Sequence, residues 1–459
     1  MPESAAPEPV SFGQALRFWL KLGFISFGGP AGQIAIMHAE LVERRRWISE
    51  ARFLHALNYC MLLPGPEAQQ LATYIGWLLH RSWGGIAAGV LFVMPSLFIL
   101  IGLSWAYVAF GDVPVVAGAF YGLKPAVTAL VLHAAHRIGT RALKKRWMWG
   151  LACASFVAIA VFDVPFPAIV ATAAAVGWLS TLGRPAAGAA GSGAPEADHH
   201  RTTPLATRAP AGPALIDDHT PTPAHARHSP WRLWAVLGTG LALWGVAMLV
   251  LMATFGWEGT LTQMAWFFTK AALLTFGGAY AVLPYVYQGA VDTHQWLTAA
   301  QMIDGLALGE TTPGPLIMVV AFVAFVGGWG QQVLGPDSLF QGAALTAVVV
   351  TFFTFLPSFI FILAGGPLVE ATHGQTRFTA PLSAITAAVV GVILNLALFF
   401  GLHVLWPRGW EAGLEPVALF IVSAAAVALF RFRVAVLPLL AACAAMGVLL
   451  QFVGFAVAP

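Results

Sequence analysis

Apolar stretches separated by short polar segments run along almost the whole chain. In the first half they lie near residues 12–37, 53–80, 86–110, 114–136, 148–162 and 165–182. In the second half they lie near residues 233–255, 261–287, 300–329, 340–364, 379–402, 414–430 and 434–456. Most of them have the roughly 20 apolar residues that a helix needs to cross the hydrocarbon core of a membrane. The pattern therefore predicts an all-α integral membrane protein.

The second half of the chain repeats the pattern of the first. At an offset of 249 residues, 24–33 aligns with 273–282, Lys21 with Lys270, Trp47 with Trp296, and 64–66 with 313–315. At an offset of 262 residues, 94–96 aligns with 356–358. A constant offset over segments of this length indicates an internal repeat. We interpret the chain as a tandem duplication.

The repeat divides the chain into four units. They are a first repeat (1–182), a linker (183–232), an extra connecting transmembrane helix (233–258) and a second repeat (259–459). The linker is rich in Ala, Pro, Gly, Thr and His and has no apolar period, which predicts a disordered cytoplasmic loop. We interpret its histidines as solvated side chains rather than metal ligands, and we expect no metal.

The extra apolar stretch turns the second repeat upside down relative to the first, as in the inverted-topology repeats of many secondary transporters. Basic residues cluster at 44–46 and 137–146, and both clusters should face the cytoplasm. They do so if the stretch 53–80 is broken at 64–66 and leaves the membrane by the face where it enters. We therefore expect about nine full crossings and four broken or re-entrant segments at the midplane.

Composition supports a membrane location. Hydrophobic residues make up 59% of the chain and charged residues 9%, against about 25% charged residues in soluble domains. The N-terminal segment has no basic n-region, so we expect no cleavable signal peptide. The predicted location is the bacterial inner membrane, with the N-terminus and the linker in the cytoplasm and the C-terminus in the periplasm.

Charge, cysteines and motifs argue against several other classes of protein. The formal charge of +3 is too small to indicate nucleic-acid binding, and the positive-inside rule accounts for most basic residues. The three cysteines have no metal-binding or disulfide spacing. The sequence has no Ser–His pairing, HExxH motif or dinucleotide fingerprint. It therefore predicts neither an enzyme nor a cofactor.

Two breaks interrupt the apolar stretches of each repeat. They are Gly28-Gly29-Pro30 and Pro64-Gly65-Pro66 in the first repeat, and Gly277-Gly278 and Pro313-Gly314-Pro315 in the second. Proline favours the first position of a helix, so new half-helices should begin at Pro30 and Pro66. Inverted repeats would bring their free N–H groups and positive dipole ends together, which suits an anion. The alternative is that the breaks are kinks for close helix packing.

Charged residues lie beside these breaks. Lys21 and Lys270 precede the Gly pairs by seven residues, roughly 10 Å along a helix, where they would add positive charge to the site. Alternatively, both lysines extend to the membrane interface. Glu67 follows the first Pro-Gly-Pro and Glu310 precedes the second. A buried carboxylate in a first helical turn is a candidate proton carrier, and the alternative is a simple helix cap.

The predicted substrate-binding set combines the breaks, the two lysines and neighbouring hydrogen-bonding side chains. Its members are Lys21, Ser26, Gly28, Gly29, Pro64, Gly65, Pro66, Gln69, Gln70, Lys270, Thr275, Gly277, Gly278, Thr311, Thr312, Pro313, Gly314 and Pro315. The Ser, Thr and Gln side chains would donate hydrogen bonds to oxyanion oxygens. Glu67 and Glu310 are the proton-coupling candidates, and no catalytic residue is predicted.

These residues resemble the chromate ion transporter family, in its long-chain, two-domain type. The resemblance rests on FGGP at 27–30, ERRRWI at 43–48, LPGP at 63–66, QQLA at 69–72, FGG at 276–278 and TPGP at 312–315. It covers both repeats and excludes the linker. It implies a secondary active transporter that exports chromate from the cytoplasm, driven by the proton gradient or the membrane potential, and that confers chromate resistance.

Other functions stay open at this point. Sulfate resembles chromate in shape and charge, so the chain is alternatively a carrier of sulfate or another oxyanion, with sulfate as a competitor, or an anion channel. An intramembrane enzyme is the least favoured alternative. The expected partners are the oxyanion and the lipid bilayer, and a homodimer is left open. The second repeat lacks the Arg triplet, the Pro after the Gly pair and the Glu after Pro-Gly-Pro. The missing arginines are expected for an inverted repeat, whereas the missing Glu argues against a two-fold symmetric ion site.

Overall fold

The computed structural model describes residues 9–27, 29–182, 214–217, 220, 223–226, 229–371 and 379–453. Apart from one isolated β-bridge, the regular structure of these residues is helical. Within this described part of the chain, five helices are long and apolar enough to cross a membrane, namely Glu67–Phe110, Pro114–Ala142, Pro230–Phe255, Pro336–Pro367 and Pro381–Leu405. The prediction of an all-α membrane protein is confirmed.

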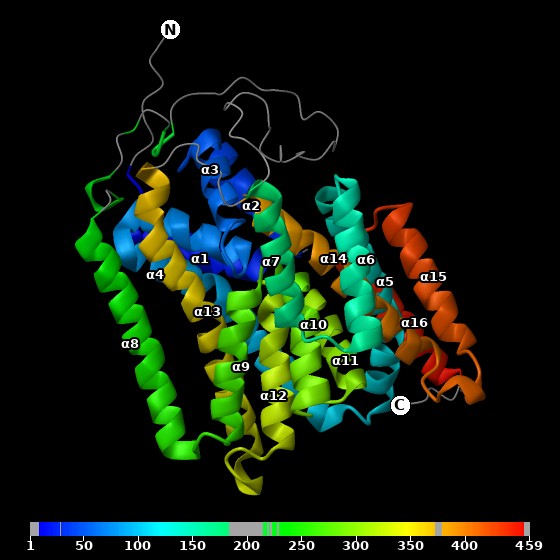
Figure 1. The fold of residues 1–459 in the computed structure, drawn as a ribbon. Coiled ribbons are helices and arrows are strands. Elements are labelled where there is room, and N and C mark those ends of the chain that lie inside the picture. The colour runs from blue at the N-terminus through cyan, green and yellow to red at the C-terminus, as the bar shows by residue number, and fades with distance from the viewer. Residues whose placement is uncertain are drawn as a thin grey trace.

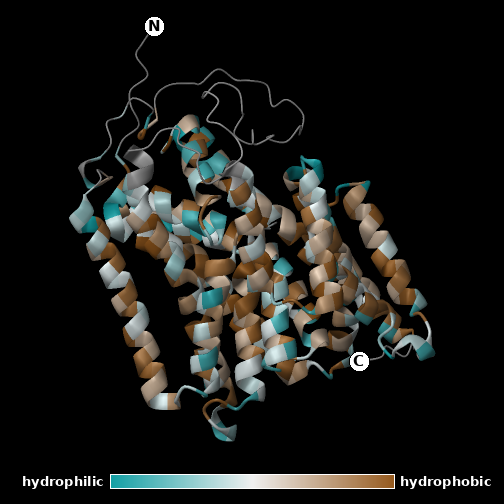
Figure 2. Cartoon of the chain, in the orientation of Figure 1, coloured by the Kyte–Doolittle hydropathy of each residue, from teal (hydrophilic) through white to brown (hydrophobic). Residues whose placement is uncertain are grey.

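The helices form one bundle, and α8 runs along one side of it from end to end (Figure 1). The first half contains α1 (Phe12–Ile25), α2 (Gly29–His38), α3 (Glu50–Cys60), α4 (Glu67–Phe110), α5 (Pro114–Ala142), α6 (Arg146–Phe162) and α7 (Phe166–Leu182). The second contains α8 (Pro230–Phe255), α9 (Thr260–Leu274), α10 (Ala279–Tyr287), α11 (Ala299–Thr311), α12 (Val319–Gly330), α13 (Leu339–Ala371), α14 (Thr379–Leu405), α15 (Pro416–Phe430) and α16 (Val436–Phe452). Apolar residues predominate along the helices, and hydrophilic ones gather towards the ends of the bundle (Figure 2).

Local backbone features recur at the offset of the sequence repeat. The π-helices η1 (Ala39–Arg44) and η3 (Gln288–Thr293) occupy matching positions. Each is followed by a non-glycine residue in the left-handed region, Arg46 with φ 56° and Gln295 with φ 52°. This agreement supports the tandem duplication, while the relative orientation of the two copies in a membrane stays a prediction.

The stretch 53–80 is broken where the sequence predicts it. α3 ends at Cys60 and α4 begins at Glu67, with a non-helical segment between them. α4 then folds back on itself, because His80 and Arg81 have non-helical φ and ψ angles. Its two arms pack closely, since a Cβ on Gly76 would lie 2.5 Å from the carbonyl oxygen of Gly84. Whether the segment leaves by the membrane face where it enters stays a prediction.

The two halves share a hydrophobic core. α5 of the first half packs against α14, α15 and α16 of the second, and α4 packs against α13. The backbones of α5 and α16 approach so closely that a Cβ on Gly122 would collide with the carbonyl oxygen of Cys443. The largest cluster of buried apolar side chains draws on both halves. Because the halves interlock, the breaks of one repeat can meet those of the other.

Part of the linker packs on the first half as a short extended segment. Ile216 forms a β-bridge with Ile48 and is buried. The amides of Leu215 and Ile216 donate to the carbonyl oxygens of Arg46 and Trp47 at 2.9 and 3.1 Å. Backbone hydrogen bonds of this kind add a strand-like segment to an exposed loop edge.

A second set of contacts fixes the linker beside α3 and α4. Arg52 donates from Nη2 to the carbonyl oxygen of Thr220 at 2.6 Å, and the His225 ring contacts the carbonyl oxygen of Trp77 at 3.0 Å. We call residues 214–217, 220 and 223–226 the strap. The composition predicts a disordered loop here, whereas the strap is held by the first half. Residues 183–213 lie outside the described residues.

Candidate functional site at the helix breaks

The breaks of the two repeats are joined by a crossed pair of backbone hydrogen bonds. The amide of Gly65 donates to the carbonyl oxygen of Thr275 at 2.8 Å, and the amide of Gly314 donates to that of Ser26 at 2.8 Å. Gly65 corresponds to Gly314 and Ser26 to Thr275 at the repeat offset of 249. The Pro-Gly-Pro break of each repeat is therefore bonded to the residue that ends the first helix of the other repeat.

A pair of serines lies against these glycines in the same crossed manner. Gly314 has φ 104°, and a Cβ there would lie 2.7 Å from the Cβ of Ser96. Gly65 has φ 127°, and a Cβ there would collide with Oγ of Ser358. Ser96 and Ser358 correspond at the offset of 262. Both glycines thus need their positive φ and the missing side chain, because only glycine meets both conditions at low cost.

New helices begin at the breaks, as predicted. α2 begins at Gly29 and α4 at Glu67, with Pro66 as its N-cap. α10 begins at Ala279 after Gly278, which has φ 96°, and a 3₁₀ turn begins at Leu316 after Pro315. The first N–H groups of a helix have no partner within the helix and carry partial positive charge. Gly28 lies outside the described residues.

Glutamine side chains line the crossed breaks. Nε2 of Gln33 donates to the carbonyl oxygen of Gly314 and, at 3.4 Å, to that of Ser26. Nε2 of Gln70 donates to the carbonyl oxygen of Pro64 at 2.8 Å. Gln69 donates to Oγ1 of Thr73 at 3.0 Å instead. Gln33 is absent from the predicted set, although a glutamine in an apolar stretch beside a break is a signal that could have identified it.

Several buried polar atoms around these breaks have no hydrogen-bond partner within the described residues. They are Oγ of Ser26 and Ser96, and Oε1 of Gln33, Gln69 and Gln70. A buried polar atom without a partner costs about 1–3 kcal/mol, so such groups usually serve a ligand or water. The two serine hydroxyls can donate to an oxyanion. Ser96 is also absent from the predicted set. The Pro-Ser pair at 95–96 recurs at 357–358, and this recurrence is the sequence signal that could have identified Ser96.

Both candidate acids lie near the N-terminus of α10. Oε1 of Glu67 lies 3.9 Å from the position of a Cβ on Gly278. Glu310 is nine-tenths buried and accepts a hydrogen bond from the hydroxyl of Tyr280, in the first turn of α10. The charge of Arg137 acts on both carboxyl groups. The two acids occupy unequal places in the sequence repeat, yet the fold brings both to one helix end.

The remaining predicted residues contribute less to this site. Lys21 and Lys270 are exposed, and the ammonium of Lys270 lies 5.6 Å from the ring centre of Trp266. The hydroxyls of Thr275, Thr311 and Thr312 donate to carbonyl oxygens of their own helices. These contacts agree with the alternative that the lysines extend to an interface. The site is therefore centred on the glycines, serines, glutamines and acids.

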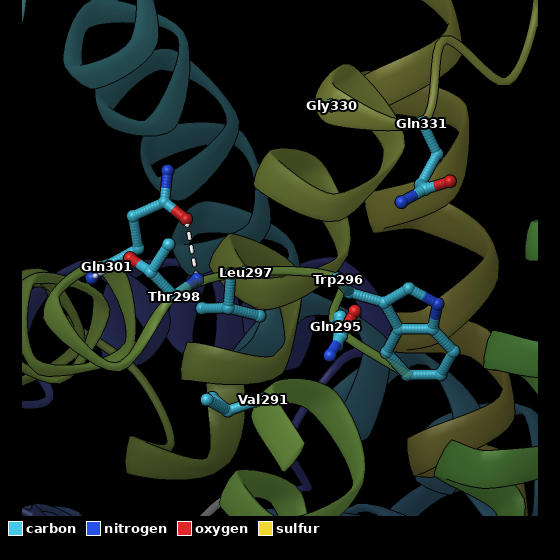
Figure 3. Close-up of a pocket in the computed structure, with 8 residues that line it drawn as sticks. All are labelled: Val291, Gln295, Trp296, Leu297, Thr298, Gln301, Gly330 and Gln331. Atoms are coloured by element: carbon cyan, nitrogen blue, oxygen red, sulfur yellow. Dashed lines mark hydrogen bonds between the residues drawn. The ribbon is translucent and has the colours of Figure 1, made fainter. Parts of the chain in front are cut away.

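A shallow pocket lies at the other end of α11. It has a volume of about 400 Å³ and is lined by Val291, Gln295, Trp296, Leu297, Thr298, Gln301, Gly330 and Gln331 (Figure 3). α11 has 13 residues, so the pocket lies about 20 Å from the Pro-Gly-Pro break. Its residues 295–298 correspond to Arg46–Ser49, which carry the strap in the first repeat. This pocket is not part of the site at the breaks.

Comparisons with known proteins identify relatives over most of the chain. The family model described as chromate transporter matches residues 13–178 and 262–448. A chromate transport protein of Pseudomonas aeruginosa is 33% identical over 392 residues, 85% of this chain and 81% of the relative. One of Cupriavidus metallidurans is 28% identical over 386 residues, 84% of this chain and 81% of the relative. An uncharacterized transporter of Bacillus subtilis, YwrB, is 29% identical over 133 residues, 29% of this chain and 68% of the relative. No solved structure gave a significant match.

Proposed function

Because the chain belongs to the chromate transporter family, we propose that it is a multi-pass membrane transporter of chromate, a tetrahedral dianion. The observation that carries this proposal is the crossing of the Pro-Gly-Pro breaks. Helix N-termini and two buried serine hydroxyls without partners lie beside this crossing, and the amide groups of Gln33 and Gln70 donate to its carbonyl oxygens. Preorganised N–H and O–H donors at helix ends suit an oxyanion and disfavour a cation.

The proposed direction of transport is export from the cytoplasm across the bacterial inner membrane. The N-terminus and the linker would lie in the cytoplasm and the C-terminus in the periplasm, with the second repeat inverted relative to the first. An inside-negative potential of 100 mV favours outward movement of a dianion by about 4.6 kcal/mol, at 2.3 kcal/mol per charge. The membrane potential would therefore drive secondary active export, with no chemical change in the anion.

Glu67 and Glu310 would couple this movement to protons. Each carboxyl group lies near the start of α10, and two ionised carboxylates there would repel a dianion. Protonation of either group would remove that repulsion, while Arg137 supplies positive charge from α5. Sulfate has the same shape and charge as chromate, so we propose it as a competitor at the same site.

The test is transport of radiolabelled chromate into inverted membrane vesicles that contain the protein, with sulfate as competitor. Ser96→Ala should raise KM about tenfold, because a hydrogen bond to a charged group is worth about 1.5–3 kcal/mol. Ser104→Ala is the matched control: Ser104 is also buried with an unpartnered hydroxyl, but it lies two turns further along α4. Its KM should stay at the wild-type value.

Two results would contradict the proposal in different ways. No energised chromate accumulation above empty vesicles would refute the substrate. Equal effects of Ser96→Ala and Ser104→Ala would leave a chromate transporter whose binding site lies elsewhere.

A further inference from the structure

A second group of ionisable side chains lies inside the bundle, away from the breaks. Asp304 on α11 is 3% exposed. Its Oδ2 accepts a hydrogen bond from the hydroxyl of Tyr107 on α4 at 2.9 Å. The same oxygen lies 3.7 Å from the ammonium of Lys124 on α5. The first half thus supplies a cation and a hydroxyl to a carboxylate of the second half.

The other oxygen of this carboxylate is unsatisfied. Oδ1 of Asp304 is buried and has no hydrogen-bond partner within the described residues. A buried ion pair repays its desolvation only if the remaining lone pairs are also satisfied, so this arrangement adds little to stability. Ionisable residues within membrane proteins are costly and usually serve transport. The unsatisfied oxygen is a place where a proton can bind.

The surroundings of Asp304 contain few other titratable groups. α11 packs against α4, α5, α12, α14 and α16. In these helices, Lys124 and Tyr107 are the groups whose charge or hydrogen bond acts on Asp304. α12 has no titratable side chain, α16 has Cys443 and α14 has His403 near its end. Among the ion pairs of the described residues, Lys124 is paired with Asp304.

We propose that Asp304 is a proton-binding site and that Lys124 is its counter-ion, released to the transported oxyanion when Asp304 is protonated. The inference rests on the proposed function and adds a residue pair to it. The proton forms an O–H bond on the carboxyl group, and no bond of the anion changes. Ionised Asp304 neutralises Lys124, whereas protonated Asp304 leaves the ammonium free to attract a dianion.

This arrangement fixes the sign of the coupling between proton and anion. A proton on Asp304 raises the affinity for the anion, and by linkage the anion raises the affinity for the proton. Proton and oxyanion would then move in the same direction, still with net negative charge. The membrane potential, rather than inward proton flow, would thus drive export through this pair.

The test is equilibrium binding of chromate to the purified protein between mildly acidic and mildly alkaline pH. The affinity of each variant is divided by that of the wild type at the same pH, which removes the titration of chromate itself. Asp304→Asn should bind about tenfold more tightly than the wild type at alkaline pH and equally at acidic pH. Lys124→Met should bind more weakly at every acidic pH value. Asp337→Asn, which changes an exposed carboxylate, should match the wild type throughout.

Each outcome separates this inference from the proposed function. A constant ratio for Asp304→Asn across the pH range overturns the inference while leaving chromate binding intact. Absence of chromate binding by the wild type contradicts the proposed function and, with it, the inference. If Asp304→Asn does not accumulate, the double variant Lys124→Met/Asp304→Asn leaves no unpaired buried charge. The double variant should bind chromate weakly, and its affinity relative to the wild type should change with pH as that of Lys124→Met does. A chromate affinity equal to that of the wild type would contradict the counter-ion role of Lys124.

Discussion

Gly314 shows how a single residue determines the geometry of the site. Its φ of 104° lies in the region that side chains other than glycine rarely adopt. Its amide bonds to Ser26 of the other repeat, and its Cα faces Ser96. Gly29 also has a positive φ, 69°, but a Cβ there would meet nothing within 4 Å. A side chain at Gly29 would therefore cause backbone strain only, whereas a side chain at Gly314 would cause both backbone strain and a collision.

Replacing these glycines by alanine should have unequal effects. Gly314→Ala should lower the free energy of unfolding by about 1–3 kcal/mol from strain, with a further loss because Ser96 must move. Gly29→Ala should show only the strain. The check is the midpoint of thermal unfolding of the detergent-solubilised protein, and equal midpoints for the two variants would contradict the close contact with Ser96.

At the scale of elements, the strap joins the linker to the broken unit formed by α3 and the first arm of α4. It pairs with the loop before α3 through Ile216 and reaches the turn of α4 through His225. In an extended segment, neighbouring side chains point to opposite sides. Ile216 is accordingly buried, while Leu215 is half-buried. The burial of Ile216 is therefore the main apolar contact of the strap.

Ile216→Asp should release the strap. A carboxylate at this buried position is costly, so the amides of Leu215 and Ile216 should exchange hydrogen faster, by at least about tenfold for a loss of 1.4 kcal/mol. The measurement is hydrogen exchange followed by mass spectrometry. Leu215→Asp is the control and should change exchange less. Unchanged exchange in Ile216→Asp would show that the backbone hydrogen bonds alone hold the strap.

At the scale of the whole molecule, the two repeats are interlocked. α5 of the first half lies against α14 to α16, and the crossed breaks bond each repeat to the other. Each half alone would expose the apolar surfaces that the shared core now buries. Outside lipid, burial of apolar surface is the main driving force for association. Within lipid, close packing of helices is the main driving force. The two halves should therefore associate with each other.

Two chains divided between residues 190 and 191 should therefore assemble when produced together. This position lies outside the described residues, so no described contact is cut. A tag on the first half should co-purify the second, and chromate transport should return. Gly122→Leu, which places a side chain against the backbone of α16, should abolish co-purification. Recovery of either half as a stable protein by itself would contradict the shared core.

The candidate site could be predicted from sequence in part. Gly65, Gly314 and the acids were identifiable because a glycine or a charge in an apolar stretch needs a specific reason. Gln33 and Ser96 carry local signals, a glutamine beside a break and a repeated Pro-Ser pair, that the predicted set did not use. Tyr280 was not identifiable, since it becomes part of the site through its contact with Glu310. Lys21 and Lys270 have the spacing of site residues, but the helix surface on which they lie is exposed.

The sequence by itself determined the helical membrane class, the duplication and the places where helices break. These properties depend on local composition and spacing, because a membrane requires long apolar helices and glycine and proline interrupt them. Only the tertiary structure decided that the breaks cross between repeats, that Glu67 and Glu310 both lie near the start of α10, and that Asp304 pairs with Lys124. Such pairings join residues about 180 to 290 positions apart, as from Lys124 to Asp304 and from Ser26 to Gly314. They depend on how the two halves pack, which no local pattern encodes.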